Sequence, residues 1–314
     1  MAKQELNKMD IIERYQGCLL GLAVGDAIGT TVEFMDRGSF PPVIDMVGGG
    51  PFDLEAGQWT DDTSMALCLA HSLVHCEGFD ASDQMNRYCN WWQYGYMSST
   101  GECFDIGMTV SDALARYMET KNSFAGSIDP FSAGNGSLMR LAPVALFYGQ
   151  DIGLLLKYAA ESSRTTHGAV ECIDACRYFA TVLRVALFAE TKLEVIKSNL
   201  YSPETEKVKA IASGEYVGKP AGVIKGSGYV IESLEAALWC FANTDSYDEA
   251  VLLAANLGDD ADTTAAICGQ VAGAYYGIKG IRENWLDKLV MRDEMMALSI
   301  KLLRKQRCGL VNYS

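Results

Sequence analysis

The stretch Gly57-Gln58-Trp59-Thr60-Asp61-Asp62-Thr63 runs directly into an apolar segment, 64–74, with helical spacing. A second stretch of the same character, Gly258-Asp259-Asp260-Ala261-Asp262-Thr263-Thr264, runs into the small-residue segment 265–274. In each stretch a glycine and a cluster of Asp and Thr precede a helix-like run, which is the pattern of a helix start. We therefore expect both sets of carboxylates at or near helix N-termini.

The two stretches can be read as ordinary helix caps or as halves of a metal site. A cap uses one side-chain oxygen, whereas these stretches hold five aspartates and four threonines. If they meet in space, carboxylates about 4 Å apart repel each other by about 4 kcal/mol per pair at an effective dielectric near 20. Such a cluster must protonate, stay spread in water or hold a cation. Its hard oxygen donors suit Mg²⁺ or Mn²⁺ better than zinc, and four carboxylates offset two divalent ions.

The composition favours a globular protein with a large core. The chain has 314 residues, of which 49 % are hydrophobic, and it contains no apolar run long enough for a transmembrane helix. A net charge of −14 argues against nucleic acid or an anionic membrane as partner. The polar segment Met1 to Arg14 is unlike a signal peptide, so we expect a cytoplasmic protein.

Helical periodicity dominates the chain, and strand-like alternation is nearly absent. Because no linker and no repeat stand out, we expect one all-α, multi-helix domain over residues 1–314. The main helices are expected at 11–26, 64–76, 79–97, 108–118, 151–162, 169–188, 231–242, 247–257, 265–274 and 285–303.

Glycines and a long loop are prominent in the first part of the chain. Gly17, Gly21 and Gly25 share one face of the first helix, which favours close packing of a neighbouring helix or a ligand. The segment 35–58 is rich in glycine and proline and lacks periodicity, so we expect a long loop that covers a functional site.

Several further polar residues have both a structural and a functional interpretation. Glu33, among apolar and hydroxyl neighbours, is either an exposed loop residue or a proton-transfer group. The glycine-rich loop 133–137 either binds phosphate through its amides or forms a tight turn that caps the next helix. Arg140 is expected to contact phosphate or an acidic residue, and His167 to act as a polar cap or a site residue.

Taken in order, these motifs resemble those of the ADP-ribosylglycohydrolase family. The resemblance spans residues 16–276, and the fixed order of its motifs makes it specific. The motifs are GDAIG (25–29) followed by Glu33, GQWTDDT (57–63), GNGSLMR (134–140), SRTTH (163–167), GSGYV (226–230) and GDDADTTA (258–265).

The resemblance implies a compact, all-helical domain of the orthogonal type with two Mg²⁺ or Mn²⁺ ions in a cleft. Glu33, Asp61 and Asp260 would be catalytic, and Asp259 a cap or a supporting group. The implied metal ligands are Thr60, Asp61, Asp62, Asp260, Asp262 and Thr263.

The resemblance also implies a binding site for ADP-ribose. The loop residues Asn135, Gly136 and Ser137 would hold its phosphates, and His167 would lie near the ligand. A further wall would be formed by Gly226, Ser227, Gly228 and Tyr229. Asp105 resembles an acidic loop position of arginine-type members and favours arginine-linked substrates.

The implied reaction is hydrolysis of the N-glycosidic bond at C1″, which releases ADP-ribose from a modified protein, with arginine as the preferred linkage. The alternatives are serine-linked or O-acetyl-ADP-ribose substrates, a non-catalytic ADP-ribose-binding or structural protein, and metal-dependent phosphoester hydrolysis. We expect an ADP-ribosylated protein as partner, no nucleic acid or membrane, and a monomer.

Overall fold

The chain folds into helices connected by long loops, as seen in a computed structural model that describes residues 8–308. The expected all-α class is confirmed, because the described residues form fourteen α-helices, and their β-pairing is limited to isolated bridges. The helices are α1 (Lys8–Gly29), α2 (Asp61–His75), α3 (Ala81–Tyr94), α4 (Met108–Thr120), α5 (Ala142–Tyr148), α6 (Ile152–Arg164), α7 (Val170–Ala186), α8 (Lys192–Ile196), α9 (Glu206–Ala212), α10 (Val230–Ala242), α11 (Tyr247–Ala255), α12 (Ala261–Tyr276), α13 (Glu283–Lys288) and α14 (Arg292–Cys308). Short 3₁₀ helices are η1 (Thr30–Val32), η2 (Pro130–Ser132), η3 (Glu215–Gly218), η4 (Ala221–Val223) and η5 (Ile278–Gly280).

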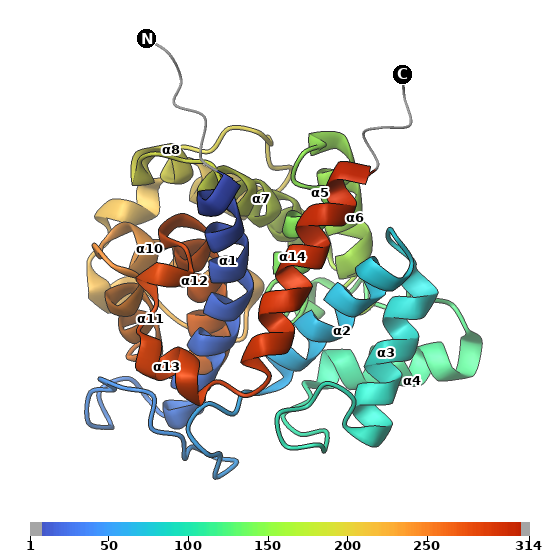
Figure 1. The fold of residues 1–314 in the computed structure, drawn as a ribbon, viewed down its shortest axis with the longest axis horizontal. Coiled ribbons are helices and arrows are strands. Elements are labelled where there is room, and N and C mark those ends of the chain that lie inside the picture. Colours follow the sequence, from blue (N-terminus) through green and yellow to red (C-terminus); the bar gives the residue numbers. More distant parts are fainter. Residues whose placement is uncertain (1–7, 309–314) are drawn as a thin grey trace.

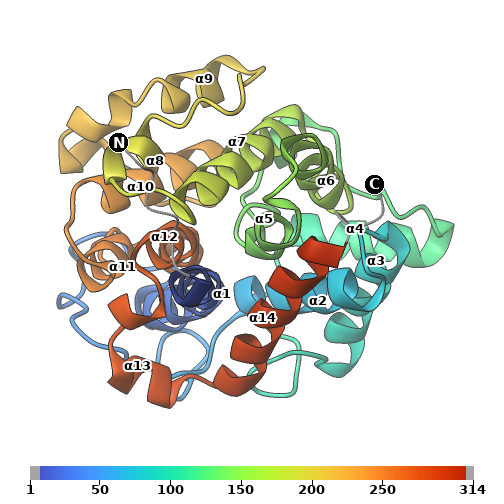
Figure 2. The same cartoon turned by 45° about the horizontal axis from the view of Figure 1, so that its top comes forward.

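Helices α1 and α12 lie side by side at the centre of the molecule (Figures 1 and 2). Their contact is made of small residues: a Cβ atom on Gly21 would lie 2.5 Å from the carbonyl oxygen of Gly269. Gly17 and Gly25 face Gly273 and the first turns of α12 in the same way. The expected close packing on the glycine face is therefore confirmed, and the partner is a helix.

This pairing sets the position of the acidic stretches. At the end of α1, Gly29 abuts Asp262 at the start of α12, so the two helices run antiparallel. Beyond Gly29, Phe34 N donates to Asp259 O and Asp259 N donates to Met35 O, both at 2.8 Å. The segment after α1 is thereby tied to the turn before α12.

Two expected helix boundaries were wrong in a way that matters for the site. Helix α2 begins at Asp61 and α12 at Ala261, several residues before the expected starts at 64 and 265. Asp61, Asp62 and Asp262 therefore belong to first helical turns, where the helix dipole stabilises negative charge.

The expected single helix at 285–303 is also wrong, because the chain forms α13 and α14 with a break between them. Met291 has a positive φ of 56°, and Val290 N donates to Gly57 O at 3.1 Å. A tertiary hydrogen bond to the first acidic stretch thus replaces helical bonding at the break. The other expected helices are present, with ends shifted by a few residues.

The segment 35–58 is a long loop, as expected, and is tied down at several points. Asn256 bonds both the amide and the carbonyl of Val43, while Lys288 donates to Met46 O at 2.9 Å. The ring nitrogen of Trp285 donates to Asp45. The loop is therefore anchored on α11 and α13, and its Phe52 contributes to the cavity described below.

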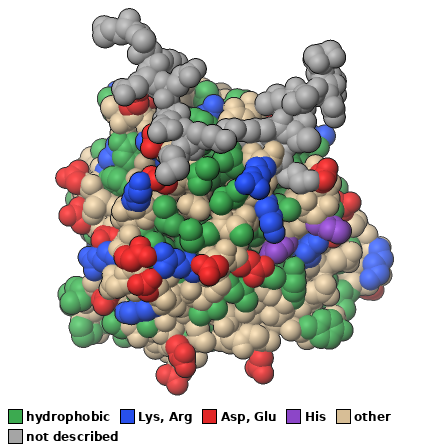
Figure 3. Space-filling view, viewed as in Figure 1, with side chains coloured by type: hydrophobic (Ala, Val, Ile, Leu, Met, Phe, Trp, Pro, Cys, Tyr) green, Lys and Arg blue, Asp and Glu red, His purple; other side chains and the backbone are tan. Residues whose placement is uncertain are grey.

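Among the described helices, none combines the length and the apolar character that crossing a membrane requires. Acidic and basic side chains are interspersed on the face that carries α1 and α14 (Figure 3). The negative net charge therefore forms no single-sign patch on this face.

Candidate active site

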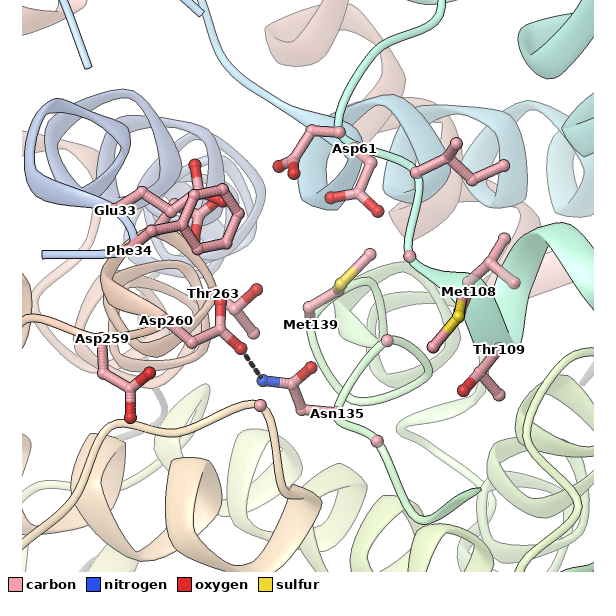
Figure 4. A pocket seen from close by; sticks show the side chains of 18 of the residues that line it. Glu33, Phe34, Asp61, Met108, Thr109, Asn135, Met139, Asp259, Asp260 and Thr263 are labelled. Carbon is pink, nitrogen blue, oxygen red and sulfur yellow. Dashed lines mark hydrogen bonds between the residues drawn. The ribbon is translucent and has the colours of Figure 1, made fainter. Parts of the chain in front are cut away.

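The two acidic stretches meet at the wall of a cavity of about 690 Å³. Asp61 from α2, Glu33 from the segment after α1 and Asp260 before α12 converge on it, while Met108 and Thr109 of α4 lie across from Asp260 (Figure 4). The lining residues are Glu33, Phe34, Phe52, Asp61, Asp105, Ile106, Gly107, Met108, Thr109, Val110, Gly134, Asn135, Gly136, Met139, His167, Gly228, Asp259, Asp260, Asp262 and Thr263.

Asp26 of α1 caps α2 from outside that helix. One carboxylate oxygen accepts from Thr60 N at 2.8 Å and Thr60 Oγ1 at 2.9 Å; the other accepts from Thr63 N at 3.0 Å and Thr63 Oγ1 at 2.6 Å. Neither Thr60 nor Asp260, the N-cap residues of α2 and α12, makes a side-chain cap bond of its own. The interpretation of both stretches as ordinary caps is therefore wrong, and their carboxylates are available for another role.

The Thr60 hydroxyl joins the two stretches. Its oxygen lies 3.2 Å from Asp62 Oδ2 and 3.1 Å from Asp262 Oδ2. A hydroxyl has one proton, so Thr60 can donate to only one of Asp26, Asp62 and Asp262, and its lone pairs face the other two carboxylates. These oxygen atoms repel each other unless a further proton or a cation lies among them.

Unpaired oxygens support a cation at this place. Asp62 Oδ1 and Asp262 Oδ1 are buried and have no hydrogen-bond partner among the described residues, which is uncommon for buried polar atoms. Carboxylate oxygens of Asp26, Asp62 and Asp262 lie within 4.8 Å of one another, as do those of Glu33, Asp105 and Asp262. The residues present therefore fit divalent cations, with Asp262 common to both groups.

Electrostatics lead to the same conclusion. Burial first, and then neighbouring carboxylates, raise the pKa of Asp61, Asp62 and Asp262 well above the usual range. The same causes raise the pKa of Glu33 to about 9 and that of Asp105 to about 7. A bound divalent cation would instead lower the pKa of the carboxyl groups that bind it, because it stabilises their ionised form.

The glycine-rich loop at 133–137 lies against the start of α12. Asn135 Nδ2 donates to Asp260 Oδ2 at 2.6 Å (Figure 4), which orients that carboxylate. Asn135 N also donates to Gly228 O at 3.1 Å, so the loop pairs with the 226–229 segment. Of the expected binding residues, Asn135, Gly136, Gly228, His167 and Asp105 line the cavity.

Other expected binding residues lie behind the wall. Ser137 is buried and bonds Ser163 and Cys176. The carbonyl oxygen of Gly226 accepts a hydrogen bond from Asp260 N at 2.9 Å, and the Ser227 hydroxyl donates to Glu232. These residues support the segments that form the cavity.

An adjoining cavity of about 530 Å³ shares Thr109, Gly134 and Gly228 with the first. The expected residue Tyr229 lines it, with its hydroxyl held by Lys207 and Glu171. Phe131 also lines it and is 101 % exposed. Sequence reasoning missed Phe131, although an apolar residue inside a Gly/Ser/Asn-rich loop is a usable signal.

Arg140 was interpreted wrongly. It is fully buried and donates to Thr166 Oγ1 at 2.7 Å, and its guanidinium carbon lies 4.7 Å from the centre of the Tyr88 ring. Among the described residues it forms no ion pair with an acid, and it does not line the cavity. Besides Phe131, sequence reasoning missed Asp26, because the residues that donate to its carboxylate are distant in sequence.

Comparisons with known proteins agree with the family resemblance of the sequence motifs. The profile of the ADP-ribosylglycohydrolase family matches residues 7–309. The chain is 42 % identical over 291 residues to ADP-ribosylarginine hydrolase Tri1 of Serratia proteamaculans, covering 93 % of this chain and 79 % of that protein. It is 31 % identical over 289 residues to the ADP-ribosyl-[dinitrogen reductase] glycohydrolase of Rhodospirillum rubrum, covering 90 % and 92 %. A solved ADP-ribosylglycohydrolase-related protein complex contains a chain that matches with a TM-score of 0.83 at 42 % identity, covering 95 % of this chain and 99 % of that one.

Proposed function

This chain belongs to the ADP-ribosylglycohydrolase family, and from this premise we propose that it is a metal-dependent hydrolase that removes ADP-ribose from arginine side chains of modified proteins. One observation carries the proposal: both acidic stretches meet in a buried carboxylate cluster at the wall of a nucleotide-sized cavity. The 42 % identity to a protein named ADP-ribosylarginine hydrolase supports the choice of linkage.

The cluster would hold the metal. Thr60, Asp61, Asp62, Asp260, Asp262 and Thr263 supply hard oxygen donors of the kind that Mg²⁺ and Mn²⁺ prefer. When bound, divalent cations polarise substrate oxygens and lower the pKa of water. Asp26 and Asn135 would keep Thr60 and Asp260 in place for this role.

Two carboxyl groups can move protons in the cavity. Cleaving a glycosidic bond requires proton transfer to the leaving group and from the attacking water. Glu33 and Asp105 line the cavity, and burial raises the pKa of Glu33 to about 9 and that of Asp105 to about 7. Without bound metal, either carboxyl can therefore hold a proton near neutral pH. We assign the principal catalytic role to Glu33, assisted by Asp61 and Asp260.

The charge of the cavity favours a cationic leaving group. Acidic side chains of Glu33, Asp61, Asp105, Asp259 and Asp260 line it, and those that are ionised and not bound to metal attract a guanidinium. Serine-linked ADP-ribose offers no cation at this position. We therefore propose that Asp105 faces the guanidino group of the modified arginine.

The remainder of the ligand would extend toward the adjoining cavity. We propose that the backbone of the loop at Gly136 holds the diphosphate, since Gly136 lines the cavity, whereas Asn135 N already donates to Gly228 O. Phe131 and Tyr229 offer aromatic surface for stacking of the base.

An assay on defined substrates tests the proposal. The protein is incubated with mono-ADP-ribosyl-arginine and mono-ADP-ribosyl-serine proteins, with Mg²⁺, with Mn²⁺ and with chelator. We expect free ADP-ribose from the arginine substrate only, and none with chelator. Release from serine instead would reassign the linkage, AMP as product would indicate phosphoester hydrolysis, and tight ADP-ribose binding without turnover would indicate a non-catalytic protein.

Three finer points belong to the same proposal. We propose that the protein acts as a monomer. Either Mg²⁺ or Mn²⁺ suits the donors, and the metal arm of the assay compares them. The cytoplasmic location stays a prediction from the composition.

A further inference from the structure

Arg140, Thr166 and His167 form a buried chain of hydrogen bonds that ends at the cavity. Arg140 Nη2 donates to Thr166 Oγ1 at 2.7 Å, and that oxygen lies 2.8 Å from His167 Nδ1. The His167 ring lies beside Gly134 and Gly136, since a Cβ atom added to them would be 3.5 and 3.1 Å from its Nε2, and all three residues line the cavity. The chain thus connects a cation in the core to the cavity wall.

The single proton of the Thr166 hydroxyl decides which ring nitrogen of His167 is protonated. Thr166 is fully buried and its Oγ1 accepts from Arg140, so its own proton needs an acceptor. Among the described residues, the acceptor in contact with it is Nδ1 of His167. Nδ1 therefore carries no proton, and in a neutral imidazole the proton is then on Nε2. If the His167 ring were flipped by 180°, Cδ2 would replace Nδ1 beside the Thr166 hydroxyl, and the hydroxyl proton would have no acceptor.

The surroundings keep the ring neutral and fixed. Burial first, and then the Arg140 charge, lower the pKa of His167 to about 3. The backbone is held as well, because His167 N donates to Ser163 O at 2.7 Å and Ser163 Oγ donates to His167 O at 2.9 Å. Nε2 has no hydrogen-bond partner in the part of the chain that the structure describes, so its proton is available to a ligand in the cavity.

We propose that Arg140 and Thr166 are positioning residues that hold His167 as the Nε2–H tautomer, which makes His167 a fixed hydrogen-bond donor to an oxygen of the ADP-ribosyl group. In this state His167 has no free lone pair to accept a proton, so it is not the general base of the reaction. The identity of the ligand rests on the proposed function, whereas the tautomer rests only on the hydrogen bonds above.

Nitrogen NMR of the full-length protein tests the tautomer. The chain has three histidines, so signals from ¹⁵N-histidine-labelled protein can be assigned with a His167→Gln variant. We expect a protonated Nε2 and a bare, hydrogen-bonded Nδ1, unchanged from about pH 5 to about pH 8. A protonated Nδ1, or a ring that titrates near its usual value in this range, would overturn the proposal.

Matched threonine variants test the role of the hydroxyl. Thr166→Val should move the Nδ1 resonance toward that of a nitrogen without a hydrogen bond, and Thr166→Ser should restore it. Thr181→Val is the control, since Thr181 is equally buried and donates to Tyr178 O at 2.7 Å, with no bond to Arg140, Thr166 or His167 among the described residues. An unchanged Nδ1 resonance in Thr166→Val, or an equal change in Thr181→Val, contradicts the assignment.

Calorimetric titration with ADP-ribose tests the donor role. His167→Ala should weaken binding by about 10- to 100-fold, the usual effect of losing a hydrogen bond to a charged group. His167→Gln, whose amide can donate from the position of Nε2, should recover most of this loss. Equal weakening in both variants, or none in His167→Ala, refutes a donor role. If wild-type protein fails to bind ADP-ribose while the NMR result holds, the proposed function fails and the tautomer stands.

Discussion

Asp26 organises the site although its side chain does not line the cavity. Its two oxygens receive four hydrogen bonds from Thr60 and Thr63, which lie 34 and 37 residues further along the chain. These bonds cap α2 and hold the Thr60 hydroxyl beside Asp62 and Asp262. A supporting residue of this kind commonly changes metal affinity by about 10- to 100-fold when it is replaced.

Asp26→Asn should therefore lower Mn²⁺ affinity by about 10- to 100-fold, because an amide NH₂ would face the donors of Thr63. It should also lower the free energy of unfolding by about 1–3 kcal/mol. Calorimetric Mn²⁺ titration and urea denaturation measure the two effects.

Asp174→Asn is the matched control for Asp26→Asn. Asp174 is also buried and accepts from Thr205 N at 2.7 Å and Thr205 Oγ1 at 2.6 Å, and it does not line the cavity. This variant should lose similar stability and keep its Mn²⁺ affinity. Equal Mn²⁺ affinities for Asp26→Asn and wild type would show that Asp26 does not support the metal site.

For single residues, the sequence indicated most of the acidic side chains of the site but not the residues that hold them in place. Asp61, Asp260 and Asp262 could be recognised because they sit in dense Asp/Thr clusters. Asp26 stands in the GDAIG motif at 25–29, but its role could not be inferred, since its bonding partners are distant in sequence. Arg140 was expected to contact phosphate or an acidic residue, because neither its burial nor the Tyr88 ring beneath it can be seen without the fold.

At the scale of elements, the pairing of α1 with α12 brings the acidic stretches together. The two helices approach so closely that glycine carbonyls occupy the space a side chain would need. The same approach places Gly29 against Asp262, and hence the Glu33 segment beside the start of α12. The separation of the metal-binding elements therefore depends on residues well removed from the cavity.

Gly21→Ala should destabilise the protein by about 1–3 kcal/mol or more, because its Cβ would meet the backbone of Gly269. Gly153→Ala, in α6, is the control: Gly153 is exposed and helical, so alanine should be neutral or add up to about 1 kcal/mol. Urea denaturation of both variants provides the comparison. A Gly21→Ala protein as stable as wild type would refute close helix contact.

Element types were predictable from the sequence, and their ends less so. The four-residue glycine spacing indicated a packed helix face correctly. The break between α13 and α14 could not be predicted, since it depends on the bond from Val290 to Gly57 and on the positive φ of Met291. The early starts of α2 and α12 were missed because their first turns are polar, and polar residues there carry no periodic apolar signal.

At the scale of the whole molecule, the fold concentrates like charge in one buried place. Glu33, Asp61, Asp62 and Asp262 are all buried, and the pKa of each is raised first by desolvation and then by neighbouring carboxylates. Such a cluster costs stability when it is ionised and unpaired. Metal binding and folding stability should therefore be linked.

This linkage predicts an unusual pH dependence. The pKa of Glu33 rises from 4.5 to about 9 on folding, so between these values the folded protein holds a proton that the unfolded chain has released. Folding then takes up protons, and the stability of chelator-treated protein should fall as pH rises from about 5 to about 9. Mg²⁺ should raise Tm and flatten this slope, because cations favour the ionised cluster.

Thermal denaturation across this range, with chelator and with Mg²⁺, measures the linkage. Glu33→Gln should make the Tm of chelator-treated protein depend less on pH, since it removes one of the groups that take up a proton on folding. A Tm that rises with pH in chelator would contradict a buried, proton-retaining cluster.

The most direct test is the number of Mn²⁺ ions bound per chain, measured by calorimetric titration and by metal analysis of the isolated complex. If α2 and α12 together form one binuclear site, wild-type protein binds two ions, and Asp62→Asn and Asp262→Asn each lose this stoichiometric binding while remaining folded by circular dichroism. Failure of the wild type to bind Mn²⁺ stoichiometrically, or two ions retained in both variants, would contradict the convergence of the two acidic stretches on a shared metal centre.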